Sequence, residues 1–287
     1  MSKRNRIPEE RLSPFLPLLL FLVLCILLAI TGILREYRKD RTVGPVIGRL
    51  KLPIIKKKII PREKTGKLQI AFIIDDVGWN KDIIKEIEEI NRPLTLSFLP
   101  KAPYSKDIFE ALRKKDEFEL ILHLPLEPNP PAQSYDKGLI KTKMTDEEII
   151  KQFNEDIKGY YPHIRGLNNH MGSSFTSDEE KMRILMEELR EKRLFFVDSL
   201  TAKQSKGYTL AKEMGIKTAQ RDIFIDNDSS PEYIQKQVKE LVEISRKQGK
   251  AIGIGHARRN TISVLKNIIP EIEKEGVEIV PVSSLLE

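Results

Sequence analysis

Short apolar runs alternate with amphipathic stretches along the chain, from Leu68 to the C-terminal Glu287. The runs are typical of buried strands, and the stretches between them have the periodicity of helices. Strands are predicted at residues 68–74, 94–99, 118–124, 164–168, 194–198, 217–226, 251–255 and 277–282, with 217–226 forming one strand or two. Such a succession of β-α units indicates a parallel sheet whose faces are covered by helices.

The residues after the first predicted strand decide between two kinds of parallel sheet. An open doubly wound sheet that binds a nucleotide has a glycine-rich turn there. This chain has Asp75, Asp76, Val77 and Gly78 instead, and carboxylates repel phosphate. We therefore expect a closed or nearly closed, distorted (β/α) barrel of about seven or eight units.

Two helix starts are marked by their capping residues. Ser177 and Glu180 have the spacing of a capping box, which predicts a helix that runs to about residue 192. Pro231 after Ser230 suits the first position of a second helix, which is expected to end near residue 248.

Residues 14–34 carry no charged side chain and are long enough to cross a bilayer as a helix. A cleaved signal peptide is the alternative, but its apolar core is usually shorter, at about 7–15 residues, and no small-residue cleavage site stands out. An uncleaved transmembrane anchor is therefore favoured. Positive residues flank both sides, so charge alone does not set the orientation. The expected organisation is a basic tail at 1–13, the anchor at 14–34, a basic linker at 35–66 and a folded domain at 67–287.

The net charge of +7 belongs to the N-terminal region. Residues 1–66 hold 15 Lys and Arg against 5 Asp and Glu, whereas residues 67–287 hold 34 against 37. A nucleic-acid-binding protein carries its positive charge on the recognition domain, so this class is not favoured. The basic linker is interpreted as a solvated spacer or as a contact for anionic lipid head groups. The single cysteine, Cys25, excludes a disulfide scaffold and a CxxC metal site.

Polar side chains gather where the predicted strands end. In barrels of this kind, catalytic residues lie at the C-terminal ends of the strands. The polar residues at those positions are Asp75, Asp76, His123, Asn168, Asn169, His170, Asp198, Asp222, Asp226 and His256. Three of the four histidines are among them, and unrelated structural roles would not place three on a common rim. The fourth, His163, precedes its strand and is interpreted as a surface residue.

The adjacent carboxylates of Asp75 and Asp76 indicate two separate roles. Successive side chains of an extended segment point to opposite sides, so one aspartate can bind a metal while the other accepts a proton. A helix N-cap followed by a turn residue is the alternative, because Asp suits both positions. Carboxylate and imidazole ligands suit Zn²⁺, and a catalytic zinc site has three protein ligands and a bound water. The metal lowers the pKa of that water and polarises a carbonyl group.

Seven segments resemble the divergent polysaccharide deacetylase family, a distant branch of the NodB-type carbohydrate esterases. They are AFIIDDVGWN (71–80), TLSFLP (95–100), LILHLPLEP (120–128), LNNHMGSSFT (167–176), FFVDS (195–199), RDIFIDN (221–227) and IGIGHAR (252–258). The resemblance runs from about Leu68 to the C-terminus. It implies a (β/α)₇-type barrel with a divalent metal, usually zinc, at the strand ends, and hydrolysis of N- or O-acetyl groups on a polysaccharide.

The resemblance also assigns roles to individual residues. Asp75 matches the general base, Asp76 a metal ligand, His123 the first histidine of the H-x-x-x-H metal motif, and His256 the late histidine that acts as general acid. The chain departs from the pattern in two places.

Glu127 stands where the second metal histidine is expected, and residues 168–172 replace an Arg-x-Pro motif. We expect His170 to replace the missing ligand, with Glu127 as a reserve ligand or a partner of the ligands.

Four further residues are candidates for supporting the site or binding substrate. Arg221 and Asp198 are expected either to position the acid and base or to form an ordinary ion pair. Trp79 either stacks on a sugar ring or packs into the wall of the barrel. Asn169 is a candidate as one of the polar residues at the strand ends.

The expected function is metal-dependent deacetylation of a cell-envelope polysaccharide. The anchor, together with a glycan substrate, predicts a domain on the outer side of the cytoplasmic membrane. One alternative is a catalytically inactive, membrane-anchored envelope protein that binds glycan or a protein partner. Another is a metal-free glycosidase that uses two of Asp75, Asp198 and Asp226, which would then lie about 5–9.5 Å apart. No sequence feature specifies the oligomeric state.

Overall fold

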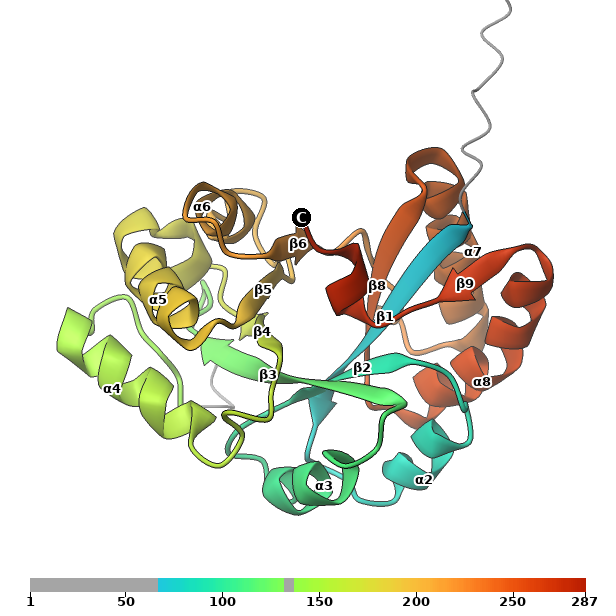
Figure 1. The fold of residues 1–287 in the computed structure, drawn as a ribbon, viewed down its shortest axis with the longest axis horizontal. Helices are drawn as coiled ribbons and strands as arrows, with labels where there is room; N and C mark the ends of the chain where they lie inside the picture. Colours follow the sequence, from blue (N-terminus) through green and yellow to red (C-terminus); the bar gives the residue numbers. More distant parts are fainter. Residues whose placement is uncertain (1–66, 132–136) are drawn as a thin grey trace, which may run out of the picture. The chain divides into compact units, whose positions relative to one another are not determined.

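The structure, a computed structural model, describes residues 67–131 and 137–287 (Figure 1). The predicted basic tail, membrane anchor and linker lie outside the described residues. Within the described ranges, no helix combines the length and the apolar character needed to cross a bilayer.

The described chain alternates strands with helices, as the sequence predicts. The strands are β1 (Leu68–Val77), β2 (Leu94–Phe98), β3 (Phe118–Leu126), β4 (Gly166–Met171), β5 (Phe195–Asp198), β6 (Thr218–Gln220), β7 (Ile223–Phe224), β8 (Lys250–His256) and β9 (Val277–Ile279). The α-helices are α2 (Ile83–Glu88), α3 (Ser105–Leu112), α4 (Asp146–Ile157), α5 (Glu179–Lys192), α6 (Gly207–Glu213), α7 (Pro231–Gln248) and α8 (Arg259–Lys274). Two 3₁₀ turns, η1 (Phe175–Ser177) and η2 (Val282–Leu285), complete the fold.

The strands form one parallel sheet that curls without closing. Its order is β6-β5-β4-β3-β2-β1-β8-β7, and β9 pairs with β1 beside this path. The parallel β/α architecture is therefore confirmed, but the barrel is an open half-barrel. The predicted strand at 217–226 explains the difference, because it divides into β6 and β7 at opposite ends of the sheet. Figure 1 shows the helices outside the curved sheet and the C-terminal segment on its concave side.

The two faces of the sheet bury different sets of side chains. Ile70, Phe72 and Ile74 of β1 belong to the larger core, which the helices cover. Ala71 and Ile73, on the opposite face, belong to a smaller core. That smaller core also contains residues of the C-terminal turn η2, which fills the concave side of the half-barrel.

The alternation of side chains along the strands carries polar groups onto the concave face. On β1, Asp75 continues the row that begins with Ala71 and Ile73. In the same way, His123 follows Ile121 on β3, and His256 follows Ile254 on β8. The concave face is therefore apolar along most of the strands and polar at their C-terminal ends.

The two predicted helix starts have different outcomes. Helix α7 begins at Pro231 and ends at Gln248, so that prediction is confirmed. Helix α5 begins at Glu179, and its cap is Asp178, whose Oδ1 accepts a hydrogen bond of 3.1 Å from the Lys181 backbone N–H. The predicted capping box at Ser177 is wrong by one residue because Ser177 belongs to the 3₁₀ turn η1.

Candidate active site

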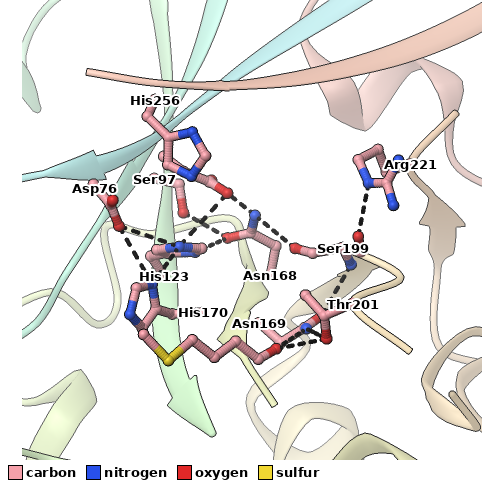
Figure 2. A network of polar contacts seen from close by, with 12 residues as sticks. Asp76, Ser97, His123, Asn168, Asn169, His170, Ser199, Thr201, Arg221 and His256 are labelled. Atoms are coloured by element: carbon pink, nitrogen blue, oxygen red, sulfur yellow. Dashed lines mark hydrogen bonds and ion pairs between the residues drawn. The ribbon is translucent and has the colours of Figure 1, made fainter. Parts of the chain in front are cut away.

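Asp76, His123 and His170 meet at the C-terminal ends of β1, β3 and β4 (Figure 2). Asp76 Oδ1 lies 3.5 Å from His123 Nε2 and 3.3 Å from His170 Nδ1. The two ring nitrogens lie 3.0 Å apart. One ligand atom from each residue therefore lies within 4.8 Å of the other two, which is close enough for all three to hold one metal ion.

A distortion of β1 brings both aspartates to the same side. The pairing of β1 with β2 shifts register between Ile74 and Val77, and Asp76 has the left-handed φ of 60°. In a regular strand, Asp75 and Asp76 would point to opposite faces. Here Asp75 Oδ2 and Asp76 Oδ1 each lie 3.5 Å from His123 Nε2. The adjacent carboxylates can therefore act at one site.

The three side chains fit a bound cation. His123 Nδ1 lies 2.8 Å from the amide oxygen of Asn168, which can only accept a hydrogen bond. The proton is therefore on Nδ1, and the lone pair of Nε2 faces His170 and Asp76. Asp76 Oδ1 is buried and accepts no hydrogen bond from any described residue. A lone pair and a carboxylate oxygen that face each other in a buried position are stabilised by a cation between them.

The surroundings favour the metal-binding protonation states. Burial and the neighbouring His170 lower the pKa of His123 to about 3, so its imidazole is neutral. Burial alone would raise the pKa of Asp76, but His170 and His123 outweigh it and lower that pKa below its ordinary value. A neutral imidazole and an ionised carboxylate are the forms that ligate a metal.

Asp75 has the environment of a general base. Its side chain is almost completely buried, and its Oδ1 accepts a 2.9 Å hydrogen bond from Asn168 Nδ2. Burial raises the pKa of Asp75 to about 7, against the opposing effects of His256 and Asn168. A base whose pKa lies near the working pH transfers protons efficiently in both directions.

Asn168 is the centre of the buried network in Figure 2. Its Oδ1 accepts hydrogen bonds from Ser97 Oγ at 2.6 Å and from His123 Nδ1 at 2.8 Å. Its Nδ2 donates to Asp75 Oδ1 at 2.9 Å and to Ser199 Oγ at 3.2 Å. All four hydrogen-bonding positions of the amide are used, which fixes the orientation of a side chain that is fully buried.

His256 pairs with the buried carboxylate of Asp226. Its Nδ1 lies 2.8 Å from Asp226 Oδ1, while Asp226 Oδ2 accepts hydrogen bonds from the His256 backbone N–H and from Thr261 Oγ1. Burial alone would lower the pKa of His256, but the hydrogen bond and charge of Asp226 outweigh it and raise that pKa above its ordinary value. His256 is therefore held as a proton donor.

Residues 72–286 match the sequence model of the divergent polysaccharide deacetylase family. The chain belongs to this family. An uncharacterized protein of Haemophilus influenzae is 33% identical over 213 residues, which cover 73% of this chain and 75% of that protein. The uncharacterized protein YibQ of Escherichia coli K12 is 28% identical over 221 residues, which cover 77% and 67% of the two chains.

Solved structures share the fold of this divergent polysaccharide deacetylase domain. An uncharacterized protein of Agrobacterium tumefaciens C58 has a TM-score of 0.72 at 22% identity, over 78% of this chain and 92% of that one. A putative cellobiose-phosphate cleavage protein of Enterococcus faecalis V583 has a TM-score of 0.58 at 15% identity, over 77% and 100% of the two chains. The family assignment made from the seven segments is thus confirmed, and the likeness to these structures concerns the fold.

Several predicted site residues of the deacetylase domain lie outside the cluster of potential ligands. Glu127 Oε2 accepts hydrogen bonds from the backbone N–H and the hydroxyl of Thr142, at 2.7 and 2.6 Å. Its carboxylate therefore organises the chain after β3. Asn169 also supports loops, because its Oδ1 accepts from the Ser199 backbone N–H and its Nδ2 donates to the Met171 carbonyl.

Asp198 and Arg221 stabilise the loop after β5 and form no ion pair with each other among the described residues. Asp198 accepts hydrogen bonds from Leu200 N, Ser205 Oγ and Tyr208 N. Arg221 donates from Nε to the Ser199 carbonyl and from Nη2 to the Leu200 carbonyl. The two residues therefore act on the loop through different groups.

Trp79 follows β1 and is 50% exposed, so it is not packed into the wall of the half-barrel. Sequence reasoning missed Asn168 as the central residue and Asp226 as the partner of His256. The available signal for Asn168 was its two-residue separation from His170, which puts both on one face of β4.

Proposed function

We propose that this chain is a metal-dependent hydrolase that removes acetyl groups from a cell-envelope polysaccharide. The convergence of Asp76, His123 and His170 beside the buried base Asp75 carries this proposal. Membership of the divergent polysaccharide deacetylase family supports the class of substrate.

Asp76, His123 and His170 would hold the metal, for which Zn²⁺ suits the ligand types best. When bound, the metal lowers the pKa of a water molecule and polarises the acetyl carbonyl group. Hydrogen bonds from neighbouring side chains orient the ligand side chains. Asn168 holds His123 in the tautomer that presents Nε2 to the ligand cluster.

Asp75 would accept the proton of the attacking water. Its Oδ1 is held by Asn168, while Oδ2 faces the ligand cluster 3.5 Å from His123 Nε2. Its pKa of about 7 lets it take up a proton near neutral pH. A positioned base of this kind contributes about 10²–10⁴ to the rate.

His256 would donate a proton to the leaving amine or alcohol. Asp226 binds His256 Nδ1, so the other ring nitrogen is the one left for the substrate. The negative charge of Asp226 favours the protonated ring. The metal-free glycosidase receives less support, because hydrogen bonds engage both carboxylate oxygens of Asp226 and of Asp198, whereas Asn168 engages only Oδ1 of Asp75.

The proposal also includes a location on the outer side of the cytoplasmic membrane, with residues 14–34 as a single anchor. The uncharged run supports the anchor, and the glycan class of substrate supports the side of the membrane.

The test is acetate release from N-acetylated oligosaccharides by the full chain in detergent, before and after treatment with a chelator. We expect activity that the chelator abolishes and added Zn²⁺ restores. Full activity in the chelated protein would contradict the proposal. Glycan binding with no acetate release, even with metal supplied, would instead support the catalytically inactive envelope protein.

A further inference from the structure

A basic pocket lies at the opposite end of the half-barrel from the candidate active site. Its volume is about 420 Å³, which is within the usual range for ligand sites. Its walls come from the residue before β4, the end of α5, the start of β5, the turn before β6 and the C-terminal segment. These positions are the N-terminal ends of the strands, whereas the candidate ligands stand at the C-terminal ends. The two sites are therefore separate.

The side chains that line the pocket carry a net positive charge. Arg165, Arg190, Arg193 and Lys217 line it, and no acidic residue does. This concentration stands out because residues 67–287 as a whole have a net charge of −3, from 34 basic and 37 acidic residues. The favourable interaction of Arg190 with the C-terminal end of α5 does not explain Arg165 or Lys217, which come from other segments.

The arginines of the pocket differ from the other arginines of the domain. The described ranges, 67–131 and 137–287, contain ten arginines. Seven of them have a side-chain hydrogen bond or ion pair there: Arg92, Arg113, Arg183, Arg221, Arg246, Arg258 and Arg259. The remaining three are Arg165, Arg190 and Arg193, and all of them line this pocket. Three guanidinium groups without a partner in the described part, gathered at one pocket, are thus available to a ligand.

The chemistry of the lining points to a phosphate group. Guanidinium groups bind phosphate and carboxylate through paired N–H donors, and phosphate accepts more of these bonds. Leu194, Phe195 and Ile216 contribute apolar surface to the same pocket, which lowers the local dielectric constant and strengthens the attraction. Ser283 adds a hydroxyl group from the C-terminal segment.

We propose that this pocket binds a phosphate-bearing ligand, either inorganic phosphate or the head group of an anionic phospholipid. The start of β1 supports the second source. Leu68 opens this strand, so the described chain begins at the same end of the parallel sheet as the pocket, and the proposed anchor precedes it in the sequence. This site does not depend on the proposed deacetylation, because none of its residues belongs to the candidate active site.

The test uses the full chain in maltoside micelles and isothermal titration calorimetry. The titrants are inorganic phosphate, dioctanoyl phosphatidylglycerol and, as the zwitterionic control, dioctanoyl phosphatidylcholine. The pocket variant is Arg190→Gln with Arg193→Gln. The matched variant is Arg183→Gln with Arg259→Gln, which removes the same charge from exposed arginines that have carboxylate partners.

We expect saturable binding of phosphate, of phosphatidylglycerol or of both, weakened about tenfold or more in the pocket variant and unchanged in the matched variant. Binding of phosphatidylglycerol alone identifies the lipid head group as the source, and binding of phosphate alone identifies a soluble ligand. The proposal is overturned if neither titrant binds, if phosphatidylcholine binds equally well, or if both variants lose the same affinity.

Discussion

Asn168 joins Asp75 to His123 through a single buried amide. Its nitrogen donates to Asp75 Oδ1 at 2.9 Å, and its oxygen accepts from His123 Nδ1 at 2.8 Å. One neutral side chain therefore orients the proposed base and sets the tautomer of a proposed metal ligand. Because the amide also contacts Ser97 and Ser199, it cannot rotate without breaking these bonds.

Replacing Asn168 with Asp should reduce deacetylation strongly while the protein remains folded. The new carboxylate would repel Asp75, and the donor to Asp75 Oδ1 would be lost. We expect kcat to fall by about 10²–10⁴, and the ¹⁵N resonances of His123 to show a changed tautomer or charge. Asn154→Asp, on an exposed part of α4, is the matched control. An unchanged kcat and an unchanged His123 spectrum would show that the amide has no positioning role.

Replacing Asp226 with Asn should shift the pH profile of kcat/KM. The proposed base Asp75 must be ionised, so activity rises with pH through its pKa, at or below about 7 once a cation is bound nearby. The proposed acid His256 must be protonated, so activity falls at higher pH. Asp226 raises the pKa of His256, and its neutralisation should move the alkaline limb to lower pH. An alkaline limb that stays in place would contradict the assignment of His256 as the acid.

The sequence predicted the candidate ligands better than it predicted their surroundings. Asp76, His123 and His170 stand at strand ends in the sequence, and parallel strands bring such ends to one edge. The central role of Asn168 was harder to predict, because it depends on the residues at which β4 begins and ends. The predicted strand at 164–168 ends before His170, whereas β4 extends from Gly166 to Met171 and puts Asn168 and His170 on one face. The link between Asp226 and His256 depends on how β7 and β8 pair, which local patterns do not specify.

Two larger features also depended on long-range packing. The sequence left open whether 217–226 was one strand or two, and this choice separates a barrel from the observed half-barrel. The last predicted strand, 277–282, pairs with β1 only over Val277–Ile279. The chain then turns at Pro281 into η2, which fills the concave side. Residue composition does not distinguish an apolar segment that forms a turn, such as η2, from one that forms a strand, such as β9.

Replacing Asp156 with Asn should stabilise the domain at neutral pH. Asp156 is buried on α4, and its oxygens accept no hydrogen bond from the described residues, although Lys101 Nζ lies 3.5 Å from Oδ1. Burial raises its pKa to about 6. The folded state therefore holds a proton more tightly than the unfolded state, and stability is lost as pH rises from about 4 to 6.

The expected gain for Asp156→Asn is about 1–2 kcal/mol in the free energy of unfolding at pH 7, shrinking towards zero near pH 4. Thermal and denaturant unfolding of the full chain at both pH values would measure it. Glu187→Gln, at an exposed position of α5, is the control. A gain that does not change with pH would mean that charge burial at Asp156 is not its cause.

The zinc content of the full chain and of two histidine variants tests the central claim most directly. His170→Ala removes a proposed ligand, and His163→Ala removes an exposed histidine outside the cluster. After loading and dialysis, elemental analysis should find about one Zn²⁺ per chain in the unmodified protein and in His163→Ala. The affinity of His170→Ala should be lower by about 100-fold or more. Equal zinc content and affinity in all three proteins, or no zinc in the unmodified chain, would contradict the account.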